Sequence, residues 1–367
     1  MNFEQQLQHI AANAEVVSPN SYRINGKTQK IFHKHAWTDY VGPLGQFGHN
    51  QSADTEQQKQ LLESHLCNGL YARIYCGIPE GKELTNLPVL QEREAFMQTL
   101  SAANHSSDEP DQNWKIYHMD AQGTWTSKNG KLRQAHSNSY IPATPNTPLA
   151  VNQYVHFLRQ KEGRHLQQVF YYVHGNHYLE HDAPQVRIYW HIKPEGAAAL
   201  IELMTRVLNE HKIAFNFKCL NHPELYVRAD SAVLYLEKRY FEYAIRVLKP
   251  HLESLSEYLL EDHPLFTQTI FKGVSFAEDP GNGQSFGMHR CQLLARALLI
   301  AYEKQQATPK ASNPEQPSSQ SSEASQLRLA CMLDVLSSKG IDIHRLHLNP
   351  NTLILPTTLQ DDHTEAA

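Results

Sequence analysis

Positively charged side chains occur on predicted strands that are otherwise apolar and aromatic. In VRIYWHI (186–192), the two-residue period of a strand places Arg187 and Tyr189 on one face. In IAFNFKCL (213–220), the same period places Lys218 on the face opposite two phenylalanines. A lysine on such a strand is partly desolvated when the face is covered. Desolvation lowers its pKa, and a neutral amine can act as a general base.

Other cations flank the predicted strands or begin a predicted helix. They are Arg228, Lys238, His289 and Arg290, with the carboxylate Asp230 between the first two. The motif QSFGMHRC (284–291) begins a helix, whose free N–H groups and dipole favour an anion. Together these residues indicate a pocket for a phosphate or a carboxylate. The alternative is that each cation is solvated or pairs with a carboxylate such as Asp230, Glu237 or Glu278.

Common catalytic and metal-binding motifs are absent from the sequence. INGKT lacks the first glycine of a phosphate-binding loop, and there is no G-x-S-x-G, H-E-x-x-H or dinucleotide-binding glycine motif. Two histidine clusters occur, His33 with His35, and His174, His177 and His181. Without cysteines or a carboxylate pattern we interpret them as solvated loop residues and predict no metal and no cofactor.

Composition excludes several classes of protein. The 367 residues carry a net charge of −5, so we expect no charge-driven nucleic-acid binding. No apolar run reaches the length of a membrane span, and the N-terminus lacks the pattern of a secretory signal. The five cysteines are scattered and odd in number, which is typical of reduced thiols. We therefore expect a cytoplasmic protein without membrane partners.

The predicted elements define an α+β fold, with a mixed or antiparallel central sheet, flanking helices and a helical N-terminal region. Strands are expected at 169–175, 186–192, 213–220 and 231–238. Four parts are expected along the chain. They are a mostly helical region with mobile loops (1–150), an α+β core with the anion pocket (151–305), a disordered Pro/Ser/Gln linker (306–327) and a short helix and strand that dock on the core (328–367).

Four long motifs give the sequence a family resemblance. The run from Val186 to Phe241 resembles the HopA family of type III effectors. LFTQTIFKGVSFAEDPGNGQSFGMHRC (265–291), GIDIHRLHLNP (340–350) and HLCNGLYARIYCG (65–77) are similar to further hallmarks of that family. The resemblance extends from about residue 30 to 351.

The resemblance implies one of two functions. HopA-like proteins of class V lanthipeptide and thioamitide gene clusters are phosphoserine/phosphothreonine lyases that work with a separate kinase-like protein. In plant pathogens the relative is an injected effector bound to a chaperone. A lyase of this kind needs a phosphate pocket and a base but no metal, which agrees with the cation pattern. A third possibility is a module that binds the phosphopeptide without catalysis and assists the kinase.

For the lyase, the resemblance and the chemistry assign roles to the candidate residues. A base removes the Cα proton of a phosphorylated residue of a precursor peptide, and phosphate leaves from Cβ to give dehydroalanine or dehydrobutyrine. Lys218 is the expected base, with Lys238 as the alternative, and His289 is the expected acid. Arg187, Arg228 and Arg290 are expected to bind the phosphate, supported by Asp230, Tyr189, Tyr235 and Phe286. The expected partners are that peptide, the kinase-like protein and a third synthetase subunit.

Overall fold

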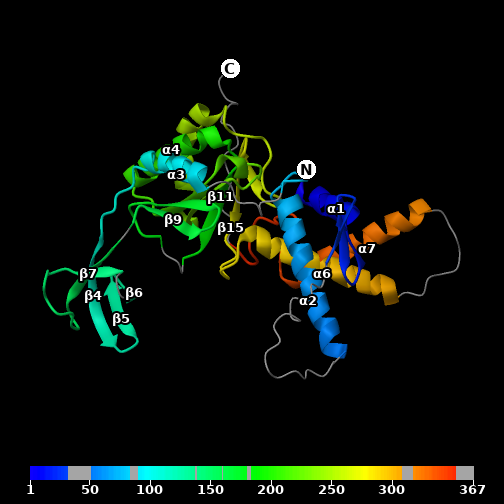
Figure 1. The fold of residues 1–367 in the computed structure, drawn as a ribbon, viewed down its shortest axis with the longest axis horizontal. Helices are drawn as coiled ribbons and strands as arrows, with labels where there is room; N and C mark the ends of the chain where they lie inside the picture. Colours follow the sequence, from blue (N-terminus) through cyan, green and yellow to red (C-terminus); the bar gives the residue numbers. More distant parts are fainter. Residues whose placement is uncertain are drawn as a thin grey trace, which may run out of the picture.

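An antiparallel sheet of seven strands forms the centre of the computed structural model, which describes residues 1–31, 51–82, 90–136, 139–158, 160–179, 183–307 and 317–352 (Figure 1). From one edge to the other the strands are Gln268–Phe271 (β14), Val274–Glu278 (β15), Gln185–Trp190 (β11), Ala232–Glu237 (β13), Phe215–Leu220 (β12), Phe170–His174 (β10) and Glu162–Gln167 (β9). Every pair of neighbours is antiparallel.

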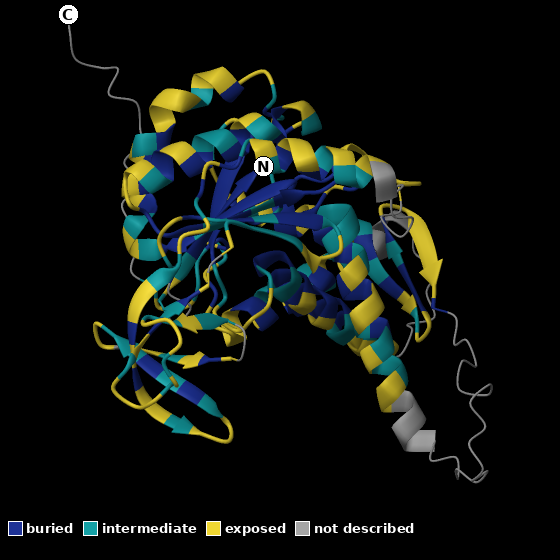
Figure 2. Cartoon of the chain, turned by 60° about the vertical axis from the view of Figure 1, so that its left-hand side comes forward, coloured by how far each residue is buried: buried dark blue, intermediate teal, exposed yellow. Residues whose placement is uncertain are grey.

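One face of this sheet is apolar and is covered by helices. Phe215 and Phe217 of β12 alternate with polar residues and point into the same core as Ile188 and Trp190 of β11. Three helices supply the rest of this core: Leu90–Ala102 (α3), Ala197–Glu210 (α4) and Phe241–Leu248 (α5). Figure 2 shows the buried strands beneath these helices.

Short helical turns connect these elements. They are Tyr71–Tyr75 (η1, a π-helical turn) and the 3-10 turns Pro194–Gly196 (η2), Pro223–Leu225 (η3), Lys238–Tyr240 (η4) and Lys249–Leu255 (η5). The turn η2 leads directly into α4, as Pro194 and Glu195 predict for a helix start.

The opposite face of the sheet meets a helical bundle. Its helices are Phe3–Asn13 (α1), Gln51–Leu70 (α2), Phe286–Ala307 (α6) and Pro317–Ser338 (α7). A small sheet, Ala14–Ser18 (β1), Ser21–Ile24 (β2) and Lys27–Lys30 (β3), packs on α2 and α6. Gly287 permits the close approach of α6 to η1, because a Cβ there would lie 2.4 Å from the ring of Tyr75.

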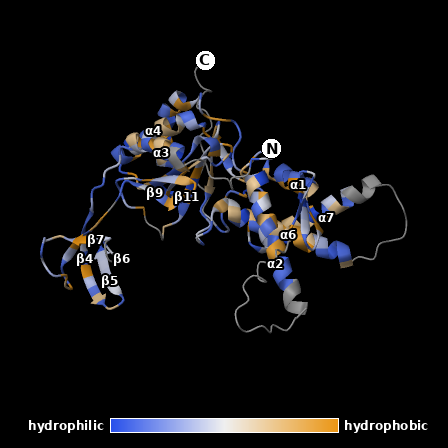
Figure 3. Cartoon of the chain, in the orientation of Figure 1, coloured by the Kyte–Doolittle hydropathy of each residue, from blue (hydrophilic) through white to orange (hydrophobic). Residues whose placement is uncertain are grey.

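A third sheet forms a lobe that projects from the main body (Figure 1). Its order is Lys131–Ala135 (β6), Gly123–Lys128 (β5), Asp111–Asp120 (β4), Tyr154–Phe157 (β8) and Tyr140–Pro142 (β7). Trp114, Ile116, Val155 and Phe157 form a small core of its own. Figure 3 shows hydrophobic residues on β4 and β7 within a lobe whose loops are hydrophilic.

The structure confirms the predicted α+β class, with antiparallel sheets and helices in the N-terminal region. The prediction that 1–150 is mostly helical was incomplete, since this region also contains the strands β1 to β7. Polar and aromatic residues alternate along β4 and β5, and cross-strand pairing stabilises them.

The prediction that 306–327 is disordered was wrong in part. The helix α6 extends to Ala307, and α7 begins at Pro317; residues 308–316 lie outside the described part. The apolar C-terminal half of α7 packs on α6, and the polar N-terminal half continues the same helix.

Two further predictions concern a strand near the C-terminus and the absence of a membrane-spanning segment. Residues 339–352 form turns, and residues 353–367, the rest of the segment in which a strand was predicted, lie outside the described part. Among the helices that the structure describes, none combines the length and apolar character needed to cross a membrane.

Candidate functional site

The polar face of the central sheet brings together charged and tyrosine side chains from four strands. The register pairs Lys218 on β12 with Tyr172 on β10, and Arg187 on β11 with Tyr235 on β13. Because paired residues of neighbouring strands share a face, these four side chains lie on one surface. We call this surface the cation–tyrosine face, and it is the candidate functional site.

Lys218 occupies an aromatic environment on this face. Its Nζ lies 4.1 Å from the ring centroid of Phe170 and 5.8 Å from those of Tyr172 and Tyr235. Within the described part of the chain, the ammonium group forms no ion pair. Burial lowers the pKa of Lys218; Tyr172 and Asp230 act against this shift, and the charges of Arg187 and Arg228 add to it. The site thus favours a neutral amine more strongly than water does.

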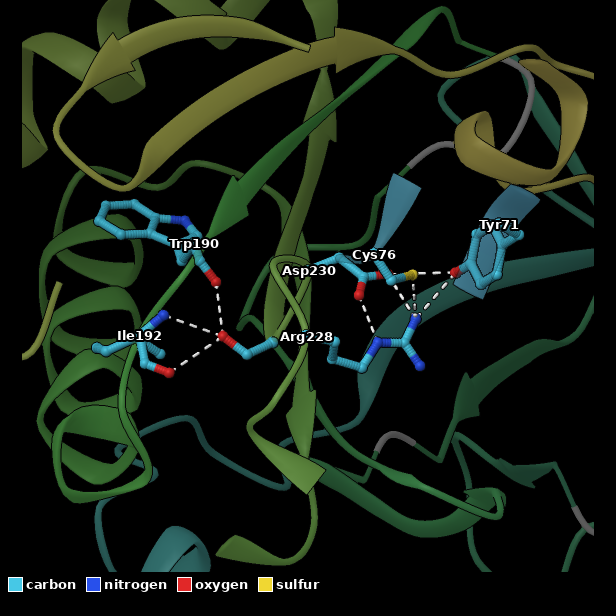
Figure 4. Close-up of polar contacts among 7 residues, drawn as sticks. Tyr71, Cys76, Trp190, Ile192, Arg228 and Asp230 are labelled. Carbon is cyan, nitrogen blue, oxygen red and sulfur yellow. Dashed lines mark hydrogen bonds and ion pairs between the residues drawn. The ribbon is translucent and has the colours of Figure 1, made fainter. Parts of the chain in front are cut away.

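Arg228 and Asp230 form a buried ion pair (Figure 4), and both charges act on the nearby Lys218. The guanidinium donates from Nε to Asp230 Oδ1 and from Nη2 to Oδ2 at 2.7 Å. Nη2 also donates to the hydroxyl of Tyr71, at 3.0 Å, and to Sγ of Cys76, at 3.3 Å. Burial alone would raise the pKa of Asp230, but the Arg228 charge lowers it, so the carboxylate stays ionised.

Arg187 links the cation–tyrosine face to the loop between β15 and α6. Its guanidinium pairs with Asp279 at 2.6 Å and donates to the carbonyl of Gln284 at 2.9 Å. The guanidinium carbon lies 5.2 Å from the ring centroid of Tyr235. Lys218 and Arg187 therefore contact the same tyrosine from two sides of β13.

Tyr189 and Phe286 form the apolar floor beneath this face. Tyr75 of η1 lies edge-on to Tyr189, with ring centroids 6.4 Å apart, and 6.3 Å from Phe286. Both predicted residues are buried in the core shared with α6. Tyr75 also stacks on Tyr71 at 5.2 Å, which positions Tyr71 against the Arg228–Asp230 pair.

Lys238 lies outside the cation–tyrosine face. It follows β13 in the turn η4, and its Nζ pairs with Glu278 at 2.5 Å and contacts Thr352. Glu278 also accepts from the backbone N–H of Asn349, at 2.7 Å. The lysine thus helps to fasten the C-terminal segment to β15.

His289 and Arg290 contact a different part of the chain. Arg290 donates to the carbonyls of Leu346 and Leu348, at 3.0 and 2.7 Å, and to Nδ1 of His289, at 2.7 Å. Burial lowers the pKa of His289 to about 4, and the charges of Arg290 and Lys339 add to the effect. A histidine with this pKa is neutral at pH 7, which does not favour its predicted role as an acid.

The structure thus brings together five of the ten predicted site residues on or beside one face: Arg187, Lys218, Arg228, Asp230 and Tyr235. Sequence reasoning missed Phe170, Tyr172, Tyr71 and Cys76. The alternation in VFYYVHG already places Phe170 and Tyr172 on one face. Tyr71 and Cys76 lie more than 150 residues away in sequence, and no local signal identifies them.

The histidine and carboxylate side chains bear on the question of a metal site. Within the described ranges, no three His, Cys, Asp or Glu side chains are grouped so as to hold a metal ion. His33, His35 and His181 lie outside the described residues.

These observations define an α+β protein in which an antiparallel sheet has one apolar face and one face that carries cations and tyrosines, and is joined to a helical bundle. The model of the HopA1 effector protein family matches residues 162–348, which is more than half of the chain, and the chain belongs to this family. The matched segment contains Lys218, Arg187 and Arg228, together with Asp230 and Tyr235.

Two solved structures are similar to the chain. The effector protein from Pseudomonas syringae pv. tomato strain DC3000 is 20% identical, with a TM-score of 0.43; the match covers 81% of this chain and 98% of that one. The effector protein from Pseudomonas syringae pv. syringae strain 61 is 17% identical, with a TM-score of 0.40, over 80% and 98% of the two chains. No curated protein matches the chain.

Proposed function

We propose that the protein is a phosphoserine/phosphothreonine lyase, which eliminates phosphate from a precursor peptide in lanthipeptide-type biosynthesis. The observation that carries the proposal is the buried Lys218, which lies amid aromatic rings, has no ion pair among the described residues and is close to two arginines. Membership of the HopA1 family supports it, because lyases resemble this family. The peptide would be phosphorylated beforehand by a separate kinase-like protein in the cytoplasm, with a third synthetase subunit as a further partner.

The elimination transfers one proton and breaks one bond. The neutral amine of Lys218 takes the proton from Cα, the electron pair of that C–H bond forms the Cα=Cβ bond, and the Cβ–O bond breaks. Phosphate departs with the bonding electrons, leaving dehydroalanine or dehydrobutyrine. Protonation makes Lys218 cationic as the phosphate leaves, so the same group stabilises the leaving anion.

The arginines would act electrostatically on the phosphate. Arg187 and Arg228 each already pair with a carboxylate, Asp279 and Asp230 respectively. These pairs fix the two guanidinium groups in place before substrate binds, and such preorganisation is the main source of electrostatic catalysis. Lys238, His289 and Arg290 have no part in this scheme, since their contacts are with Glu278 and the C-terminal segment.

A phosphothreonine peptide and mass spectrometry test the proposal. The protein is incubated with the peptide, a metal chelator and no nucleotide, and the expected result is loss of one phosphoric acid. The unphosphorylated peptide serves as the control and should be unchanged. If the native precursor, phosphorylated by its kinase, also loses nothing, the lyase proposal fails.

Binding separates the alternatives that remain. A Lys218→Met variant that binds the phosphopeptide and does not eliminate phosphate supports catalysis by Lys218. A wild-type protein that binds the phosphopeptide and never eliminates phosphate would instead be a non-catalytic partner of the kinase. Absence of both activities would favour a secreted effector that acts on host proteins.

A further inference from the structure

The cavity between the projecting lobe and the central sheet contains an arginine whose side chain has no hydrogen bond or ion pair among the described residues. This cavity has a volume of about 430 Å³, and Arg133 of β6, Phe157 of β8, and His174 and Asn216 of the central sheet are among its lining residues. The lobe lies outside residues 162–348, so this cavity combines the family segment with a part of the chain beyond it.

Arg133 is held by aromatic rings instead of by carboxylates. Its guanidinium carbon lies 3.7 Å from the ring centroid of Phe157, 5.0 Å from that of Tyr178 and 5.8 Å from that of Trp114. Over the residues that the structure describes, its side chain donates no hydrogen bond and forms no ion pair. A guanidinium held over a ring by a cation–π contact keeps its N–H groups available for a planar anion.

The acidic residue at the same cavity is already paired with another cation, although its charge also acts on Arg133. Asp111 accepts from Nζ of Lys128 at 2.7 Å and from Nε1 of Trp114 at 2.9 Å. On the opposite wall, Oδ1 of Asn216 lies 2.9 Å from Nδ1 of His174. The amide nitrogen of Asn216 donates to no group in the described ranges, so it is a second free donor beside Arg133.

The cavity adjoins the cation–tyrosine face along the strands. Asn216 lies two residues before Lys218 on β12, and His174 lies two residues after Tyr172 on β10, on the same face. Two residues of a strand span roughly 7 Å. An extended peptide advances by the same distance, so a peptide with its phosphorylated residue at Lys218 places a nearby side chain in this cavity.

We propose that Arg133 is a specificity-determining residue, which binds the carboxylate of an acidic side chain about two residues from the phosphorylated serine or threonine. This inference rests on the proposed function for the position of the peptide. Bidentate guanidinium–carboxylate contacts are strong and directional, and the amide of Asn216 adds a third donor. The lyase would therefore prefer phosphopeptides that are acidic next to the site of elimination.

The test compares matched phosphopeptides in binding and in elimination. The peptides carry Glu, Gln, Lys or a second phosphoserine two residues before or after the phosphothreonine. Elimination is followed by mass spectrometry, and binding by fluorescence anisotropy with the Lys218→Met variant as the background. For wild type we expect the Glu peptide to exceed the Gln peptide about tenfold in kcat/KM and in affinity.

Arg133→Gln should reduce this Glu/Gln ratio to about one, and Arg133→Glu should reverse it in favour of the Lys peptide. The matched control is Arg206→Gln, an exposed arginine on α4 that pairs with Glu202, and it should keep the wild-type ratio. The charge reversal also guards against a variant that merely collapses the cavity, because a collapsed cavity would not prefer lysine.

Three results would overturn the inference. They are an equal response of wild type to the Glu and Gln peptides, an unchanged ratio in Arg133→Gln, and a doubly phosphorylated peptide that surpasses the Glu peptide, which would assign the cavity to phosphate. Loss of elimination for every peptide, with Arg133-dependent binding of the Glu peptide retained, would refute the lyase and leave the carboxylate site in place.

Discussion

The two faces of the seven-stranded sheet belong to the same strands, but their side chains affect stability in opposite ways. On β12, Phe215 and Phe217 are fully buried among aliphatic residues below α4 and α5. One residue along, Lys218 faces three aromatic rings and forms no ion pair among the described residues. The first face contributes stability through apolar burial, whereas the second keeps a desolvated amine that costs stability. A destabilising buried group of this kind is typical of a residue with a catalytic or binding role.

The largest expected effect of this contrast is on stability. Phe217→Ala should lower the free energy of unfolding by about 3–5 kcal/mol, because it removes a fully buried ring and leaves a cavity. Lys218→Met, of similar length, should leave that free energy unchanged or raise it, because it removes an unpaired charge. Urea denaturation of both variants checks this. A strongly destabilised Lys218→Met would show that the lysine is structural.

Asp230→Asn should be nearly as damaging as the core variant. Removing the carboxylate leaves the buried guanidinium of Arg228 without its counterion, at a cost of roughly 3–5 kcal/mol. The matched control is Asp279→Asn, where the carboxylate is partly exposed and the expected loss is smaller. Equal losses in the two variants, measured by thermal or urea unfolding, would contradict the difference in burial.

Much of this contrast follows from the sequence. The two-residue period in VRIYWHI and IAFNFKCL placed Arg187 and Lys218 opposite the apolar residues of their strands, and the sheet confirms both placements. Strand order determines which cations meet, and no local pattern encodes it. Tyr71 and Cys76 reach Arg228 from a π-helical turn far away in the chain.

Arg290 is a second residue whose contacts could not be predicted from the sequence. Its position in the first turns of α6 predicted an anion-binding role, by the dipole of the helix N-terminus. In the structure its guanidinium donates to the carbonyls of Leu346 and Leu348, which come from a segment more than 50 residues later. Backbone carbonyls satisfy a guanidinium as well as an anion does, and sequence spacing cannot distinguish the two.

These contacts give a third prediction. Arg290→Met should lower the free energy of unfolding by about 2 kcal/mol, since two carbonyls lose a charged donor. Elimination of phosphate should continue once the variant is folded. Unfolding by urea and the mass-spectrometric assay on the same preparation check both parts. A folded variant that no longer eliminates phosphate would show that Arg290 is part of the functional site.

Lowering the pH should reduce the free energy of unfolding, by less than the substitutions above, through two histidines on the bundle side of the molecule. Burial lowers the pKa of His289 and of His347 to about 4, from 6.5. Between pH 6.5 and 4 the unfolded chain therefore binds more protons than the folded chain, so stability falls as the pH is lowered through this window. Urea midpoints at pH 7 and pH 4.5 measure the effect. His347→Gln should reduce the difference, and an unchanged difference would exclude His347 as a cause.

The central claim is that the amine of Lys218 takes a proton, and Lys218→Arg tests it most directly. Arginine keeps the positive charge but does not deprotonate at accessible pH, so it can hold a phosphate and cannot act as the base. Single-turnover elimination from a saturating phosphothreonine peptide, followed by mass spectrometry, should fall by about 10²–10⁴-fold in this variant with peptide binding retained. Elimination by Lys218→Arg at close to the wild-type rate would contradict the assignment and reduce Lys218 to a phosphate-binding charge.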